Sequence, residues 1–448
     1  MSTIDEMVIK ARAAMNQIRD YTQEQADKMV KVIGKVVYDH AEELAKEAVE
    51  ETRFGAVEPK TMKNSFFSAA LWQHLKGKPS VGILSEDPDT GITEICHPIG
   101  VVASITPVTV PNICPMGNSM LALKGKNAII IGPSPNSKKS SGTTVKLMRS
   151  ELEKIGAPAD LIQVIEEPTL ESSRELMSKC DVVVATGGPG LVKAAYQSGK
   201  PAFGVGPGNS QVIVEHIDDY SSFAKETILS RSYDHGTACL CIQAMIYQRN
   251  LEMEIQRSLE AEKAFFIDDQ AEIDKIRQIL FIDGVHSKKM AGQNAVFVAT
   301  AAGLKIPPDT SILVLKMAKF GPGEVLCEEK VCPVMLAYAY DDFDEAIKIA
   351  LANYEVAGKG HTGGIYSNNR DHIIKAGIAF PVSRFMVNQA TTDGGSGPKN
   401  YLTPSNSLGC GSWGNNSISE NLTYKHLLNI QKVSFPVNKP PMPADPWA

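Results

Sequence analysis

Apolar residues recur every three or four positions through the first 77 residues of the chain, which is the period of a helix with one apolar face. The pattern predicts several helices over residues 3–77, with a second helix that opens at Thr22 and a break at Gly55. Five apolar residues share one face of that second helix: Met29, Val30, Ile33, Val36 and Val37.

Between residues 98 and 213 short apolar runs alternate with helical patterns. Runs that are apolar throughout are typical of strands buried on both faces, as in a parallel sheet covered by helices. The alternation predicts a doubly wound parallel sheet, and its strands are expected at residues 100–105, 128–131, 161–165, 181–185 and 211–214.

The alternation restarts after residue 215 and predicts a second α/β domain. Strands are expected at residues 244–247, 311–315 and 334–338, and helices at 223–229, 251–264 and 342–351. Residues 391–416 are rich in Gly, Ser, Asn and Thr, which is typical of a loop. The predicted fold class is α/β, with two doubly wound, Rossmann-type domains.

Residues 81–96 lie outside this alternation. Two short apolar runs, at 81–84 and 93–96, flank the turn signal Asp87-Pro-Asp-Thr-Gly91 and predict a β-hairpin. We interpret the hairpin as an arm that stands apart from the two sheets.

The composition and charge of the chain exclude some classes of binding partner. The 448 residues carry a net charge of −6 and no Lys/Arg cluster, which argues against nucleic acid or an anionic membrane. The N-terminus has no basic segment followed by an apolar one, and no apolar run reaches 18 residues. We therefore expect a cytoplasmic protein, with no membrane partner.

The eight cysteines do not form the dense pattern of a disulfide scaffold, and we expect reduced thiols. Cys239 and Cys241, or Cys327 and Cys332, could be read as zinc ligands. Structural zinc sites usually combine a pair of cysteines two to four residues apart with a second matching pair of ligands. Neither stretch supplies that second pair. We predict no metal.

Cys239 follows the small-residue turn Gly236-Thr-Ala238 and precedes an apolar run. A cysteine after such a turn can point its sulfur into a pocket, where a thiolate is a strong nucleophile. The alternative is a buried structural cysteine, because free cysteine packs like a small apolar residue.

Two glycine-rich turns precede Cys239. Thr186-Gly-Gly-Pro-Gly190 lies between a predicted strand and a predicted helix, where glycines let the backbone approach a phosphate at a helix N-terminus. Gly204-Val-Gly-Pro-Gly-Asn209 is the second turn. A plain tight turn is the alternative for either, but two such turns and a cysteine favour an aldehyde-oxidising site.

The chain resembles the CoA-acylating aldehyde dehydrogenases, including the aldehyde half of the bifunctional aldehyde-alcohol dehydrogenases. The matching segments run in order along nearly the whole chain. The most specific are Gly360-His-Thr362 and Leu408-Gly-Cys-Gly-Ser-Trp-Gly-Asn-Asn-Ser-Ile-Ser-Glu-Asn421. The run Asn421-Leu-Thr-Tyr-Lys-His-Leu-Leu-Asn429 is most similar to the forms that act on succinate semialdehyde or sulfoacetaldehyde.

The resemblance implies an aldehyde dehydrogenase-like fold. Residues 1–80 and 97–214 would form the dinucleotide-binding domain, and residues 215–428 the catalytic domain. Residues 81–96 and 429–448 would form an oligomerisation arm and a C-terminal tail. The arm implies a homodimer or homotetramer, and a monomer in light scattering would count against it.

The resemblance also implies the roles of individual residues. Cys239 would be the nucleophile, and His361 would lie near the active site unless it is a hydrogen-bonded core histidine. NAD or NADP is the expected cofactor and coenzyme A the expected co-substrate. The residues expected to bind the nucleotide are Thr106, Pro107, Thr109, Ser134, Thr186, Gly187, Gly188 and Glu329.

One absence bears on the acceptor of the acyl group. Hydrolytic members of the family carry a glutamate base in the turn that corresponds to Val205-Gly-Pro-Gly208, where this chain has no carboxylate. A site without that base activates water poorly, so a thioester would persist until a thiol takes it. This supports CoA; water or phosphate as the acceptor is an alternative, as is a non-catalytic nucleotide-binding protein.

The chain departs from the family at three positions. Val110 replaces an asparagine that donates to the oxyanion, Ile242 replaces a glutamate, and His235 replaces an asparagine. Loss of one oxyanion donor can cost about 10²–10³ in rate. We expect Asn112 or the Cys239 N–H to compensate, and the pocket to be reshaped around Ile242.

A short anionic aldehyde, either sulfoacetaldehyde or succinate semialdehyde, is the expected substrate, with acetaldehyde or propionaldehyde as the alternative. Arg231 and His235 precede Cys239 and would bind the carboxylate or sulfonate. The alternative for Arg231 is an ion pair between domains.

Overall fold

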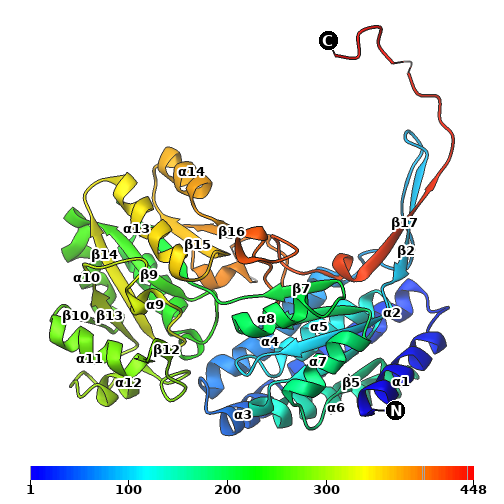
Figure 1. Cartoon of the computed structure of the whole chain (residues 1–448), viewed down its shortest axis with the longest axis horizontal. Coiled ribbons are helices and arrows are strands. Elements are labelled where there is room, and N and C mark those ends of the chain that lie inside the picture. The colour runs from blue at the N-terminus through cyan, green and yellow to red at the C-terminus, as the bar shows by residue number, and fades with distance from the viewer. Residues whose placement is uncertain (1, 396, 398, 441, 448) are drawn as a thin grey trace.

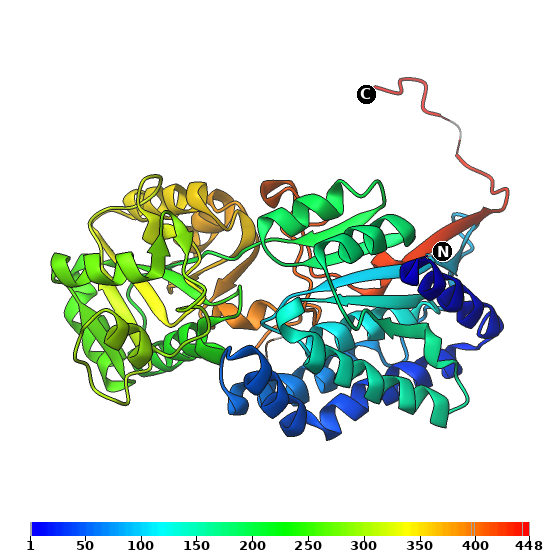
Figure 2. The same cartoon turned by 60° about the horizontal axis from the view of Figure 1, so that its bottom comes forward.

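The computed structural model describes residues 2–395, 397, 399–440 and 442–447, and it shows two α/β units side by side (Figure 1). A slender arm rises from the end of one unit that lies away from the other, and the chain ends in an extended tail beyond it (Figure 1). The view turned by 60° shows helices on both faces of the first sheet (Figure 2).

Four helices begin the chain, as the apolar period predicts. The five apolar residues expected on one face of the second helix are all buried, and that helix packs on α5 (Ile113–Lys124) and α6 (Lys138–Lys154) of the first unit. Thr22 caps it by accepting a hydrogen bond from the Gln25 N–H. The helices are α1 (Thr3–Gln17), α2 (Gln23–Asp39), α3 (Ala41–Thr52) and α4 (Val57–Leu75).

The first sheet has five parallel strands in the order β5-β4-β3-β6-β7. Its central strands β3 and β4 are buried along their whole length, as apolar runs covered on both faces should be. The strands are β3 (Val101–Thr106), β4 (Ala128–Pro133), β5 (Ile162–Val164), β6 (Val182–Thr186) and β7 (Ala202–Val205). The helices between them are α5 (Ile113–Lys124), α6 (Lys138–Lys154), α7 (Leu170–Lys179) and α8 (Pro189–Tyr196).

The second sheet has seven parallel strands in the order β10-β13-β14-β9-β8-β15-β16. They are β8 (Ser210–Val214), β9 (Ile242–Gln248), β10 (Ala264–Ile267), β13 (Ile312–Lys316), β14 (Val334–Tyr340), β15 (Gly360–Tyr366) and β16 (Val382–Val387). The helices are α9 (Tyr220–Ser232), α10 (Glu252–Ala261), α11 (Gln270–Leu280), α12 (Ala295–Ala301), α13 (Phe343–Val356) and α14 (Arg370–Ala379). A small ribbon joins β11 (Phe281–Ile282) to β12 (Val285–His286).

One strand belongs to a different sheet from the one expected. Residues 211–214 were predicted to close the first sheet, but β8 pairs with β9 and β15 in the second. The chain passes from one sheet to the other within residues 206–209. Four residues cannot hold the crossover helix that would let β8 lie parallel beside β7 in the first sheet. The first unit therefore ends at β7, a few residues before the predicted boundary at 214.

The predicted hairpin forms the arm. Strands β1 (Gly82–Asp87) and β2 (Ile92–Pro98) pair antiparallel, and β17 (Leu428–Ser434) adds to the other edge of β2. The chain thus returns from β16 to the first unit, where the Asn127 Nδ2 donates to the Leu427 carbonyl at 2.8 Å. Throughout the described residues, every helix is too short or too polar to cross a lipid bilayer.

Candidate active site

A cavity of about 420 Å³ lies beside Cys239, between the two units. Pro107 and Thr109 reach it from the end of β3, and Thr186 to Gly188 reach it from the end of β6. The strand order of the first sheet reverses between β3 and β6: the chain adds β4 and β5 on one side of β3, and then β6 and β7 on the other side. Open parallel sheets bind ligands at that reversal.

The cavity brings together seven of the residues that the sequence predicted. They are Cys239, Glu329, Pro107, Thr109, Thr186, Gly187 and Gly188. Thr186 to Gly188 form the turn before α8, as expected. A methyl group built on Gly188 would meet no atom within 4 Å, so the backbone of the turn is open for close approach.

Cys239 is held between α9 and β9 by a tight turn. Asp234 and His235 both have left-handed backbones, with φ of 48° and 56°. The loop of Gly206 to Gly208 packs directly on the cysteine, because a Cβ on Gly208 would lie 1.7 Å from the Cys239 carbonyl oxygen. Glycine at 208 therefore allows the close approach that holds Cys239 in place.

The electrostatics keep the Cys239 thiol protonated. Burial and then the Glu329 carboxylate raise its pKa, and the Arg384 guanidinium offsets only part of this. Burial also raises the pKa of Glu329 to about 7, although the Gly208 N–H and the Arg231 charge act in the opposite direction. Glu329 is therefore close to half ionised at neutral pH, and its charge is felt at the sulfur.

We expect alkylation of Cys239 by iodoacetamide, in the protein without added nucleotide, to be slow at pH 7. It should accelerate about tenfold per pH unit, because the thiolate fraction rises in that proportion below the pKa. A Glu329→Gln variant should react up to about tenfold faster above pH 7, where it removes a negative charge. Below pH 6 it should match the parent, because Glu329 is then protonated.

Mass spectrometry of the peptide that carries Cys239 would measure this rate, since the other seven cysteines are also free thiols. Cys96→Ser provides a matched comparison, because it changes a buried cysteine of the arm that does not line the cavity. Equal rates for the parent and Glu329→Gln across the whole pH range would contradict the coupling.

A buried ionic cluster lies under the cavity, and the sequence did not predict it. The Asp234 carboxylate, with no exposed side-chain surface, accepts hydrogen bonds from Lys63 Nζ at 2.6 Å and Lys60 Nζ at 2.8 Å. Burial and then the Lys63 charge lower the pKa of Lys60 to about 8. Burial works against the Lys63 ammonium as well, but Asp234, Tyr233 and Cys241 together outweigh it and the pKa of Lys63 is raised.

Two residues expected to bind an anionic tail lie outside the cavity. Arg231 is fully buried, and its guanidinium donates to the carbonyls of Ile242, Gly236 and Cys332. The prediction for Arg231 was wrong, and it makes no ion pair among the described residues either. The His235 Nδ1 donates to the Gly292 carbonyl at 3.0 Å, so His235 also has another role.

The expected compensation for Val110 is only partly supported. Val110 lines the cavity, but the Asn112 Nδ2 donates to the Thr144 hydroxyl at 3.0 Å, and Asn112 does not line the cavity. The backbone N–H of Cys239 is the remaining candidate oxyanion donor. Ile242 is buried in the core of the second unit and does not reshape the pocket, contrary to expectation.

The other predicted residues lie around the site without lining it. Thr106 is buried at the end of β3, and Ser134 follows β4 with its N–H bonded to the Thr106 carbonyl at 3.0 Å. His361 is fully buried on β15, beside Thr362 Oγ1 at 2.9 Å. Burial and then Arg384 lower the pKa of His361 well below its usual range, so the ring is neutral. Its buried Nε2 has no hydrogen-bond partner among the described residues, so the ring is only partly bonded.

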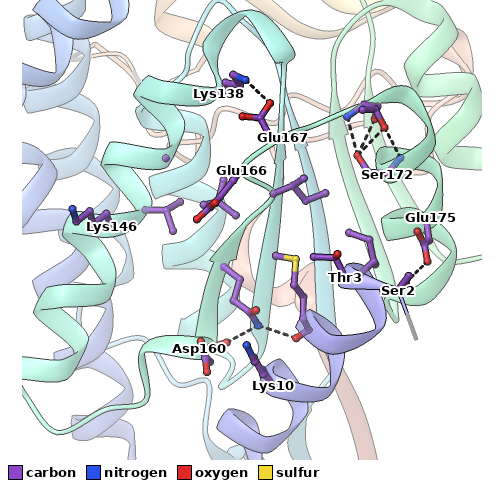
Figure 3. Close-up of a pocket in the computed structure, with 18 of the residues that line it drawn as sticks. Ser2, Thr3, Lys10, Lys138, Lys146, Asp160, Glu166, Glu167, Ser172 and Glu175 are labelled. Carbon is purple, nitrogen blue, oxygen red and sulfur yellow. Dashed lines mark hydrogen bonds and ion pairs between the residues drawn. The ribbon is translucent and has the colours of Figure 1, made fainter.

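A second, open groove of about 1280 Å³ lies between α1, α6, α7 and β5 (Figure 3). Its walls carry both signs of charge, including Lys10, Lys146 and Glu166, and the ion pair of Lys138 with Glu167. None of the predicted site residues lines it, so the groove is separate from the Cys239 cavity.

The comparisons with known proteins agree with this architecture. Residues 1–273 match the model of the aldehyde dehydrogenase family. The chain is 47% identical over 433 residues to a succinate-semialdehyde dehydrogenase (acetylating) of Clostridium kluyveri, covering 97% of this chain and 96% of the relative. It is 39% identical over 433 residues to a sulfoacetaldehyde dehydrogenase of an Acholeplasma species, covering 95% and 89%.

Among solved structures, an acetylating aldehyde dehydrogenase from Geobacillus thermoglucosidasius superposes with a TM-score of 0.95 at 36% identity. The match covers 98% of this chain and 97% of that one. The chain therefore belongs to the aldehyde dehydrogenase family. The predicted fold class and the resemblance to the acylating members are confirmed.

Proposed function

We propose that the chain is a CoA-acylating aldehyde dehydrogenase, which oxidises a short aldehyde with NAD or NADP and transfers the acyl group to coenzyme A. The observation that carries the proposal is the cavity that joins Cys239, Glu329 and the turn of Thr186 to Gly188 at the reversal point of the first sheet. The names of the two relatives, both dehydrogenases of aldehydes, support the reaction class.

The residues present fit a nicotinamide dinucleotide. The turn of Thr186 to Gly188 opens α8, where backbone N–H groups and the open side of Gly188 suit a pyrophosphate. The Glu329 carboxylate faces the same cavity and can accept hydrogen bonds from ribose hydroxyls. When bound, the dinucleotide supplies the acceptor for the hydride that leaves the substrate carbon.

Cys239 performs the covalent steps. Its thiolate adds to the aldehyde carbon, and the backbone N–H of Cys239 is placed to stabilise the oxyanion. Loss of hydride from that carbon leaves an acyl thioester on the sulfur, and the thiolate of CoA then displaces Cys239 to form acyl-CoA. The sum is aldehyde, CoA thiol and NAD(P)⁺ to acyl-CoA, NAD(P)H and one proton, a reversible reaction.

The cavity supports CoA as acceptor because its described lining residues include one carboxylate, that of Glu329, and this carboxylate is assigned to the ribose of the dinucleotide. The loop of Val205 to Gly208 faces Cys239 without an acidic side chain, so no carboxylate base is available there to activate water. Water or phosphate as acceptor remains the alternative that the assay below distinguishes.

We expect NAD(P)H absorbance to rise continuously only when aldehyde, dinucleotide and CoA are all present. Without CoA, one equivalent per active site should form, because the thioester is not released. Steady turnover without CoA, or with phosphate in its place, would contradict the CoA-acylating assignment. No burst and no turnover with any aldehyde would favour a nucleotide-binding protein that has lost catalysis. Assays with NAD and NADP in parallel would determine the cofactor.

The sequence-based expectations of an anionic substrate, a cytoplasmic location and a homodimer or homotetramer stay predictions. The names of the relatives support an anionic aldehyde, whereas the two residues expected to bind its charge lie outside the cavity. The arm of β1, β2 and β17 exposes Ile83 and Ile430, which supports an oligomer.

A further inference from the structure

We infer that Lys330 is a positioning residue, which holds the backbone from which Glu329 reaches the Cys239 cavity. The inference rests on the proposed function, because Glu329 is assigned there to the ribose of the dinucleotide. It adds the residue that keeps this carboxylate in place. Lys330 is fully buried and lies outside the lining of the cavity, so it acts through its neighbour.

The segment that runs from η5 (Val325–Cys327) to β14 presents alternate side chains to the cavity. Glu329 and Val331 line it, whereas Lys330 between them lies in the interior of the protein. This alternation is the period of an extended backbone. A shift of one residue along the segment would exchange the carboxylate for an ammonium at the cavity, so the function requires a fixed register.

The Lys330 side chain folds back on this segment. Its Nζ donates to the Leu326 carbonyl at 2.8 Å and to the Glu328 carbonyl at 3.1 Å. Both carbonyls belong to the stretch that directly precedes Glu329. The two hydrogen bonds therefore restrain the backbone that carries the carboxylate, while the carboxylate itself stays free to accept hydrogen bonds in the cavity.

Two further hydrogen bonds connect the segment to the backbone on either side of the nucleophile. The Lys330 N–H donates to Gln243 Oε1 at 3.1 Å, and Gln243 lies on β9, the strand that follows the nucleophile. The Asn209 Nδ2 donates to the Cys327 carbonyl at 2.9 Å, and Asn209 follows the glycine that packs on the nucleophile. The place of the Glu329 carboxylate relative to the sulfur is thus set from both ends of the segment.

Stability alone does not account for a lysine at this position. Within the part of the chain that the structure describes, its Nζ donates to two carbonyls and to no carboxylate. Burial and then the Arg231 charge lower the pKa of Lys330 to about 7. A neutral amine still carries one hydrogen for each carbonyl, so both contacts persist above that pH. A methionine would fill the same space without the cost of burying an amine.

The test is a double-mutant cycle on dinucleotide binding to the full chain, without aldehyde or CoA. Nicotinamide fluorescence measures the dissociation constants of NADH and NADPH. Lys330→Met should raise the constant of the tighter-binding dinucleotide about tenfold, because Glu329 is no longer held where ribose hydroxyls reach it. Glu329→Ala should raise it at least as much. Adding Lys330→Met to Glu329→Ala should then change it less than about twofold further.

Each other outcome contradicts a different step. An unchanged constant in Lys330→Met, or a tenfold loss both with and without Glu329, would overturn the inference, because Lys330 would then not act through the carboxylate. If Glu329→Ala binds as tightly as the parent, the ribose assignment and the inference fail together, and the reaction at Cys239 stands. If the parent binds neither dinucleotide, the proposed function fails as well.

Lys305→Met, at an exposed position of the second unit, is the matched control for loss of a lysine and should bind both dinucleotides like the parent. Lys330→Gln tests rescue, because it keeps an amide N–H₂ on a side chain one atom shorter, and it should lose less affinity than Lys330→Met. If thermal unfolding shows that Lys330→Met does not fold, the cycle is run with Lys330→Gln. An equal loss with and without Glu329 would overturn the inference there too.

Discussion

A Cys239→Ser protein is expected to lose at least about a thousand-fold in the rate of CoA-dependent NAD(P)H formation. The serine hydroxyl is a far weaker acid than a thiol, so a much smaller fraction of it is ionised at neutral pH. The same burial and Glu329 charge that raise the pKa of the thiol also disfavour an alkoxide. Initial rates with saturating aldehyde, dinucleotide and CoA would measure the loss.

Cys96→Ser is the matched control for this substitution. Cys96 is a buried cysteine in the arm whose thiol donates to the Gly82 carbonyl at 3.3 Å, a hydrogen bond that a serine can keep. Its turnover should equal that of the parent, and thermal unfolding should show that both variants are folded. If Cys239→Ser kept a tenth or more of the parent rate, Cys239 would not be the nucleophile.

An Asp234→Ala protein is expected to be less stable than the parent by about 3–5 kcal/mol, because it leaves two buried ammonium groups without a counter-charge. Lys60 and Lys63 would face each other, and the N–H of Ala56 would lose its acceptor at 3.1 Å. The shift in the midpoint of urea denaturation measures the effect.

Asp39→Ala removes the carboxylate of an exposed ion pair, in which Lys35 Nζ lies 2.5 Å from the Asp39 oxygen. Because water screens this pair, its loss should leave the midpoint nearly unchanged. An Asp234→Ala midpoint equal to that of Asp39→Ala would mean that Lys60 and Lys63 release their protons, or reach water, at little cost.

Strands β3 to β6 of the first sheet could be predicted because each is a nearly continuous apolar run between helices. Strand β7 was missed, because its second half belongs to the glycine-rich stretch that begins at Gly204. The sheet that a strand joins could not be predicted, because pairing depends on where the chain turns, and an apolar run such as β8 suits either sheet. Strand β15 escaped prediction because its glycines and polar residues lack a strand pattern. A Cβ on Gly360 would lie 1.8 Å from the Cys410 carbonyl, so close packing favours glycine there.

Cys239 and the turn of Thr186 to Gly188, which line one cavity, could be singled out because each is marked by a few consecutive residues. The anion-binding prediction failed because nearness to Cys239 in sequence does not determine where a side chain points. Arg231 lies in the last turn of α9 and donates to three backbone carbonyls instead. The cluster of Lys63 and Asp234 joins positions 171 residues apart, and no local spacing could have indicated it.

The chain passes between the two sheets twice, outward through residues 206–209 and back between β16 and β17. One crossing holds the glycine that contacts Cys239, and the other holds Leu408 of the cavity wall. A single break in either tether would therefore leave the halves covalently joined. Any hinge motion that widens the cavity must bend both tethers together, which couples substrate entry to the backbone that holds the sulfur.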